Sequence, residues 1–77
     1  MINFNKIFHI EKALLENGIT VNFIGMTTNG SYGFKEDLKK RVLYVWTGKG
    51  DDYMTKISSK GDKRLKIIDV KIYRAIK

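Results

Sequence analysis

The sequence predicts an α+β fold, in which an N-terminal helix packs on one face of an antiparallel meander sheet of about 4–5 strands. Two patterns predict it. Over residues 4–16 apolar side chains recur at the spacing of a helix, and from residue 19 they alternate with polar ones, as in a strand. Glycine-containing turns then divide the chain into short segments. With 77 residues, 43% of them apolar, we expect one small basic domain with one core, spanning 1–77.

The helix is predicted over about residues 4–17. At about 100° per residue its apolar side chains fall in one arc, and Ala13 and His9 fall on the opposite, polar side, where we expect a solvated histidine. Asn17 and Gly18 are typical of a helix end. Glu11 interrupts the apolar arc, and we expect it to reach the rim and pair with a lysine. The arc consists of Phe4, Ile7, Phe8, Ile10, Leu14 and Leu15.

The strands follow from alternation and from the turns between them. Asn29-Gly30 is a strong hairpin signal because both residues tolerate positive φ. In the last strand the apolar phase changes, which predicts a β-bulge near Ile67 and Ile68. The expected strands are 19–27, 31–35, 41–47, 53–59 and 65–76, with 36–40, 48–52 and 60–63 as connections. The predicted core is Phe4, Phe8, Leu14, Leu15, Val21, Phe23, Ile68, Val70 and Ile72.

Composition excludes several classes of protein. There is no cysteine, so disulfide scaffolds, zinc ribbons, iron–sulfur sites and thiol nucleophiles are ruled out. That is compatible with a reducing, cytoplasmic location. The single histidine leaves no His-rich metal site, so no metal or cofactor is expected. No apolar run approaches the roughly 20 residues of a transmembrane helix, and the predicted helix carries only Lys6 and Lys12, which disfavours a membrane partner.

The charge distribution points to an anionic partner. The net charge is +7, and residues 35–77 carry all of it, because the two lysines and two glutamates of residues 1–34 cancel. Nucleic acid and an acidic protein surface are the partners such a patch favours, although lysine-rich faces also serve solubility alone. Most of the excess lies in two clusters: Lys35, Lys39, Lys40 and Arg41, and then Lys60, Lys63, Arg64 and Lys66. If the strands form a meander, both clusters lie at one end of the sheet and the turn 48–52 lies at the other.

Aromatic residues on the predicted sheet supply a second feature. Tyr44, Tyr53 and Tyr73 lie close in sequence to lysine or arginine residues, and bases stack on such rings while cations hold the phosphates. Trp46 and Tyr44 share a strand face, so either can instead belong to the core.

Catalysis is not expected. Gly48-Lys49-Gly50 has the composition of a phosphate-binding nest but is followed by Asp51 and Asp52, which repel anions, so a hairpin turn is the better interpretation. No acid lies near His9 to orient it as a base.

Two hypotheses remain from different classes. The first is a nucleic-acid-binding module that uses the two basic clusters and the tyrosines. The second is a protein-interaction module that uses an edge strand or an exposed sheet face, such as a small phage or mobile-element inhibitor or accessory protein that binds a larger host protein. The Lys- and Ile-rich composition is similar to that of such small proteins from AT-rich genomes.

Overall fold

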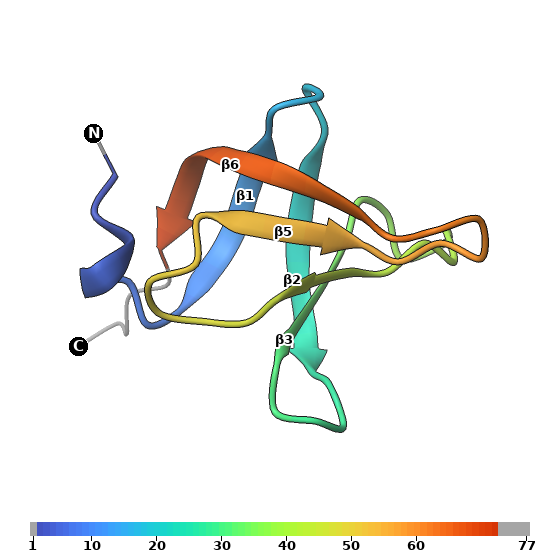
Figure 1. Cartoon of the computed structure of the whole chain (residues 1–77), viewed down its shortest axis with the longest axis horizontal. Coiled ribbons are helices and arrows are strands. Elements are labelled where there is room, and N and C mark those ends of the chain that lie inside the picture. Colours follow the sequence, from blue (N-terminus) through green and yellow to red (C-terminus); the bar gives the residue numbers. More distant parts are fainter. Residues whose placement is uncertain (1, 73–77) are drawn as a thin grey trace.

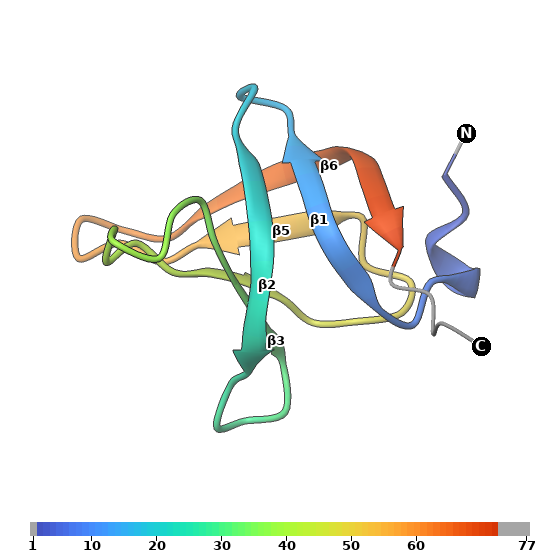
Figure 2. The same cartoon turned by 180° about the vertical axis from the view of Figure 1, so that it is seen from behind.

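The computed structural model describes residues 2–72, which form a closed antiparallel barrel (Figures 1 and 2). Each strand pairs with the next along the chain, and the last pairs with the first. One 3₁₀ turn, η1, precedes the barrel. The elements are η1 (Phe4–Lys6), β1 (Ile10–Leu15), β2 (Thr20–Met26), β3 (Tyr32–Lys35), β4 (Tyr44–Trp46), β5 (Tyr53–Lys56) and β6 (Lys63–Ile72). Within residues 2–72 no helix is long and apolar enough to cross a membrane.

The α+β prediction is wrong: the fold is all-β, and the segment expected to be a helix is mainly strand β1. The reason lies in a β-bulge. The pairing of β1 with β6 shifts register between Ile10 and Lys12, which makes Glu11 an extra residue. Ile10, Ala13 and Leu15 are the buried residues of β1. The bulge therefore places the first two inward-pointing residues of β1 three positions apart instead of two, and this sequence pattern resembles the apolar spacing of a helix.

Closure of the barrel accounts for the choice of strand over helix. Local propensity favours a helix at Lys12, Ala13 and Leu14, but propensity is a weak effect that tertiary pairing overrides. As a strand, β1 pairs with β2 on one side and β6 on the other, so both ends of the meander lose their unpaired edges. Glu16 extends this seam, because its backbone N–H donates to the Lys66 carbonyl at 2.9 Å and its carboxylate accepts from the Lys66 N–H at 2.5 Å.

The other elements agree better with the sequence. Each predicted strand segment contains a strand, and 36–40 is a connection. The strands within 19–27, 31–35, 41–47 and 53–59 are shorter than predicted, whereas β6 begins at Lys63, two residues earlier than predicted. Gly18 and Gly30 have φ values of 84° and 86°, the left-handed conformation expected of them, although Gly18 turns between two strands rather than ending a helix. The bulge predicted in the last strand is confirmed, since the β1–β6 register skips Ile68.

The interior of the barrel is filled with side chains. Trp46, Tyr44 and Phe34 are the largest fully buried ones. Of the predicted core, Leu15 and Val21 are buried, and Phe4, Phe23 and Val70 pack against the core while partly exposed. Phe8, Ile68 and Ile72 do not belong to it, with exposed fractions of 64%, 51% and 43%, and Leu14 is only half-buried. The buried set is Ile7, Ile10, Ala13, Leu15, Val21, Phe34, Tyr44, Trp46, Met54, Leu65 and Ile67.

Candidate nucleic-acid interface

The meander predicts both basic clusters at one end of the barrel, and the structure agrees only in part, because Lys66 pairs with Tyr53 beside the turn 47–52. The connections 36–43 and 57–62 meet at one end, and the turn 47–52 lies at the opposite one, near the N-terminal segment (Figure 1). A hydrogen bond of 2.9 Å from the Ile57 N–H to the Leu43 carbonyl links the two connections where they adjoin β5 and β4. We call this end, formed by 36–43 and 57–62, the basic end.

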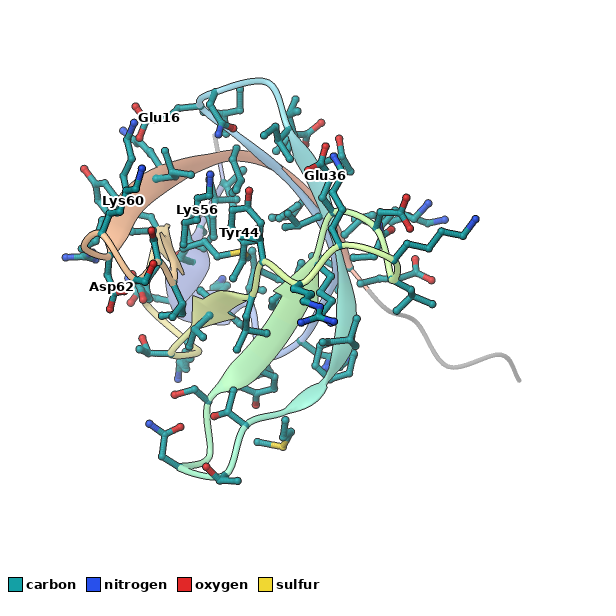
Figure 3. The ribbon with its side chains drawn as sticks, turned by 90° about the vertical axis from the view of Figure 1, so that its right-hand side faces the viewer. Glu16, Glu36, Tyr44, Lys56, Lys60 and Asp62 are labelled. Carbon is teal, nitrogen blue, oxygen red and sulfur yellow. The ribbon has the colours of Figure 1, made fainter. Side chains whose placement is uncertain are left out.

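The two clusters occupy different sides of the basic end. Figure 3 looks onto it and shows Tyr44 and Lys56 between Lys60 on one side and Glu36 on the other. In the first cluster Lys39, Lys40 and Arg41 are exposed, and Lys40 is held by Glu36 at 3.3 Å. Lys35 is half-buried, pairs with Asn22 of β2, and lines a hollow on the β2–β3 side. The first cluster thus belongs to the β2–β3 side of the molecule.

The second cluster adjoins Tyr53 on the outer face of β5 and β6. Tyr53 pairs with Lys66, and Thr55 pairs with Arg64. Their chain neighbours Met54 and Leu65 are buried, with exposed fractions of 0% and 3%. Because side chains alternate across a strand, Tyr53, Arg64 and Lys66 point outward together. This group, with the exposed Lys60 in the neighbouring hairpin, is the part of the predicted site that the structure assembles, whereas Lys63 shares the inner face of the buried Leu65.

An ordered stack forms at the centre of this outer face. The Arg64 guanidinium carbon lies 4.6 Å from the centroid of the Tyr53 ring. Asp51 Oδ1 accepts hydrogen bonds from Arg64 Nη2 at 3.4 Å and from the Tyr53 N–H at 3.0 Å, and Oδ2 accepts from the Thr47 hydroxyl at 2.7 Å. The Arg64 side chain remains 62% exposed, so it presents its outer side to solvent. We call Arg64 and Tyr53 the stacked pair.

Asp51 has a structural role beside the stacked pair that the sequence interpretation missed. We interpreted it there as a charge that repels anions, but three hydrogen bonds tie its carboxylate to the fold. Its carbonyl also accepts from Trp46 Nε1 at 2.7 Å, which anchors the turn to the core. The sequence signal was its place two residues before an aromatic strand start, where an Asx turn is common.

One of the predicted tyrosines, Tyr44, does not join this face. Tyr44 is 1% exposed, so its ring belongs to the core and offers no surface for a base. Burial raises the pKa of Tyr44; the nearby Glu36 carboxylate adds to the rise and Lys40 opposes it. Tyr73 lies outside the described residues. Trp46, left open by the sequence, is a core residue.

The structure also places His9 and Glu11, two residues that the sequence singled out. His9 is half-buried rather than solvated, and its ring packs edge-on to Phe23 with centroids 4.8 Å apart. Glu11 pairs with Lys71 at 3.4 Å, the lysine pairing expected of it, but from a strand. Within residues 2–72 no three His, Cys, Asp or Glu side chains cluster as metal ligands.

Exposed apolar side chains form a second surface feature. Ile24 and Leu38, with exposed fractions of 41% and 79%, line the hollow beside Lys35 on the β2–β3 side. At the opposite end Phe8 is exposed, and Lys49 Nζ lies 4.9 Å from its ring centroid.

Comparisons with known protein families, with curated proteins and with solved structures each find no match.

Proposed function

We propose that this protein is a non-enzymatic module that binds single-stranded nucleic acid on the outer face of β5 and β6. The observation that carries the proposal is the stacked pair, an exposed arginine on a half-buried tyrosine, with Lys60 and Lys66 exposed nearby. A base can stack on the outer side of the guanidinium, which combines a flat surface with a positive charge. The lysines then contact the phosphates on either side.

Single strands fit this surface better than a duplex. Stacking on Arg64 needs a base whose face is free, and paired bases inside a helix offer none. Of the acidic side chains beside this face, the Asp51 carboxylate is paired with Arg64 and the Glu16 carboxylate accepts from the Lys66 N–H. A cytoplasmic location, where such strands are accessible, is part of the proposal.

The test is fluorescence anisotropy of a labelled oligonucleotide at several salt concentrations. If Lys60, Arg64 and Lys66 contact three phosphates, log K should fall with log salt at a slope of roughly −2. Arg64→Ala should weaken binding about tenfold and make the slope shallower by about 0.7, because stacking and charge are both lost. Arg64→Lys should keep the slope but still weaken binding, because the flat surface is lost.

The matched control is Lys12→Ala, which removes an exposed lysine from β1 rather than from the outer face of β5 and β6. It should reduce affinity far less than Lys66→Ala. Equal losses from the two variants, or tighter binding of the matching duplex than of the single strand, would contradict the proposed site.

The second candidate function is protein interaction, which the exposed Ile24 and Leu38 favour. A closed barrel leaves no edge strand among the described residues, so a partner cannot add a strand to the sheet. It would instead dock on the β2–β3 side, where these two side chains lie. Leu38→Asp should then abolish binding of a host protein of the kind a small phage or mobile-element inhibitor would target. The same variant should leave oligonucleotide affinity unchanged.

A further inference from the structure

Three side chains form a row across the basic end that the proposed stacking does not use. Tyr44 pairs with Lys56, and Lys56 pairs with Lys63. Lys56 lies two residues after the buried Met54, and Lys63 lies two before the buried Leu65. All three therefore point to the inner side of the sheet, where the barrel opens to solvent, and paired side chains there are about 5 Å apart.

The two lysines of this row face each other without an anion. Like charges directly opposite on neighbouring strands destabilise a sheet. The ion pairs formed within residues 2–72 join Lys40 to Glu36, Arg64 to Asp51 and Lys71 to Glu11, so neither Lys56 nor Lys63 has an acidic partner there. A bound anion between the two ammonium groups would turn this repulsion into attraction.

Tyr44 adds a hydroxyl donor beside the lysines. Its hydroxyl forms no hydrogen bond with another residue of 2–72, and no buried side-chain oxygen in that range is left unpaired, so the hydroxyl reaches solvent. Figure 3 shows Tyr44 and Lys56 next to each other in the middle of the basic end. A tyrosine hydroxyl, with an ordinary pKa of 10.0 that burial raises further here, is protonated at neutral pH and can donate to an anion.

We propose that Tyr44, Lys56 and Lys63 bind a phosphate monoester, the terminal phosphate of the strand held by the stacked pair. A monoester carries a charge of about −1.5 to −2 and has three free oxygens, enough for two ammonium groups and one hydroxyl. An internal phosphodiester has one charge and a sugar on either side, which cannot approach a hydroxyl recessed at the barrel end. The identity of the carrier strand rests on the proposed function, whereas the phosphate site does not.

Glu36 tunes the affinity of this site. Its carboxylate acts on Tyr44 electrostatically and is compensated by Lys40 at 3.3 Å. Glu36→Gln removes a negative charge close to the bound phosphate, so it should tighten phosphate binding. A role in folding alone would not produce this gain.

The first experiment compares oligonucleotides with and without a terminal phosphate, at the 5′ and 3′ ends separately, by anisotropy. The protein should bind one phosphorylated form about tenfold tighter, the scale of one or two charge-assisted hydrogen bonds. Lys56→Ala, Lys63→Ala and Tyr44→Phe should each reduce that preference severalfold, and Lys12→Ala should leave it unchanged. Circular dichroism verifies that each variant is folded. No preference at either end, or a preference that survives Lys56→Ala and Tyr44→Phe, would overturn the proposal.

The second experiment separates the phosphate site from the proposed function. Inorganic phosphate is titrated into the ¹⁵N-labelled protein, with chloride at equal ionic strength as the control. Shifts of the amide resonances of Tyr44, Lys56 and Lys63 with phosphate alone support the site, even where no oligonucleotide binds and the proposed function therefore fails. Equal responses to phosphate and chloride would show that the row is not a site.

Discussion

Ala13 gives the sharpest test of the barrel, because the helical and the β interpretations place it on opposite sides. On a helix it falls on the polar face, where a lysine would be tolerated. In the barrel it is 1% exposed and pairs with Val21 on one side and Val70 on the other. We therefore predict that Ala13→Lys prevents folding.

The magnitude follows from burial. Forcing a larger side chain into a packed interior costs about 1–3 kcal/mol, and removing an ionised group from water adds several more. A domain of this length has only about 3–5 kcal/mol of stability to lose. Leu14→Lys is the matched control, since Leu14 is half-buried and pairs with the exposed Thr20 and Asp69. Losing half of a leucine's burial should cost about 1 kcal/mol.

The assay is urea denaturation followed by circular dichroism. Ala13→Lys should show no cooperative transition, and Leu14→Lys should unfold cooperatively with a slightly lower midpoint. Ala13→Asp should also prevent folding. A lysine at position 13 could extend its ammonium group to water, whereas the shorter aspartate side chain would leave its carboxylate buried. If both Ala13 variants unfold like the parent and Leu14→Lys does not fold, the helical interpretation is right and the barrel is wrong.

Three further predictions concern the core. Met54→Ala should lower the free energy of unfolding by about 2–5 kcal/mol, measured in urea, because Met54 is fully buried. Trp46→Phe should lower the free energy of unfolding by about 1–3 kcal/mol beyond the effect of the lost apolar burial, because the Asp51 carbonyl loses the Nε1 donor at 2.7 Å. A smaller loss would mean that a water molecule donates to this carbonyl in place of Nε1. The pKa of Tyr44 is raised above its ordinary value of 10.0, so its stabilising effect is complete below pH 10 and is lost as the pH rises through the folded value. Stability should therefore fall above about pH 10, and Tyr44→Phe should make that fall less steep.

The sequence predicted the positions of the strands after residue 19 well because the turn signals are local. Gly30 adopts a φ of 86° in the turn between β2 and β3, as its place after Asn29 suggested. The bulge at Ile68 was visible as a change of phase within a single strand. Each of these features is decided by residues within a few positions of one another.

The first strand was mispredicted because its structure depends on residues far away in the chain. The bulge at Glu11 is defined only by pairing with β6, some sixty residues later. Phe8 was assigned to the core because it falls within the helical arc, but in the barrel it precedes β1 and is exposed. Helical and bulged-strand spacing coincide over so short a segment, and only closure of the barrel separates them.

The candidate site was predicted in part for the same reason. The meeting of the connections 36–43 and 57–62 at one end followed from the order of the strands, but which side chains share a face depends on register. Register brings Arg64 onto Tyr53 and sets Lys56 beside Tyr44, and it sends Lys35 to the β2–β3 side. Composition identified the charges but could not assign them to faces.

Closure of the barrel also decides where a ligand can bind. The interior is filled by Trp46, Tyr44 and Phe34, and the described strands leave no edge for an added strand, so binding is confined to the outer faces and the two ends. Strand β6 serves both kinds of surface at once. Lys63 points to the basic end and its neighbour Arg64 points to the outer face, because consecutive side chains of a strand lie on opposite sides. Under the proposed function, a nucleic-acid strand stacked on Arg64 would pass within one residue of Lys63 at the barrel end, where the proposed phosphate site lies.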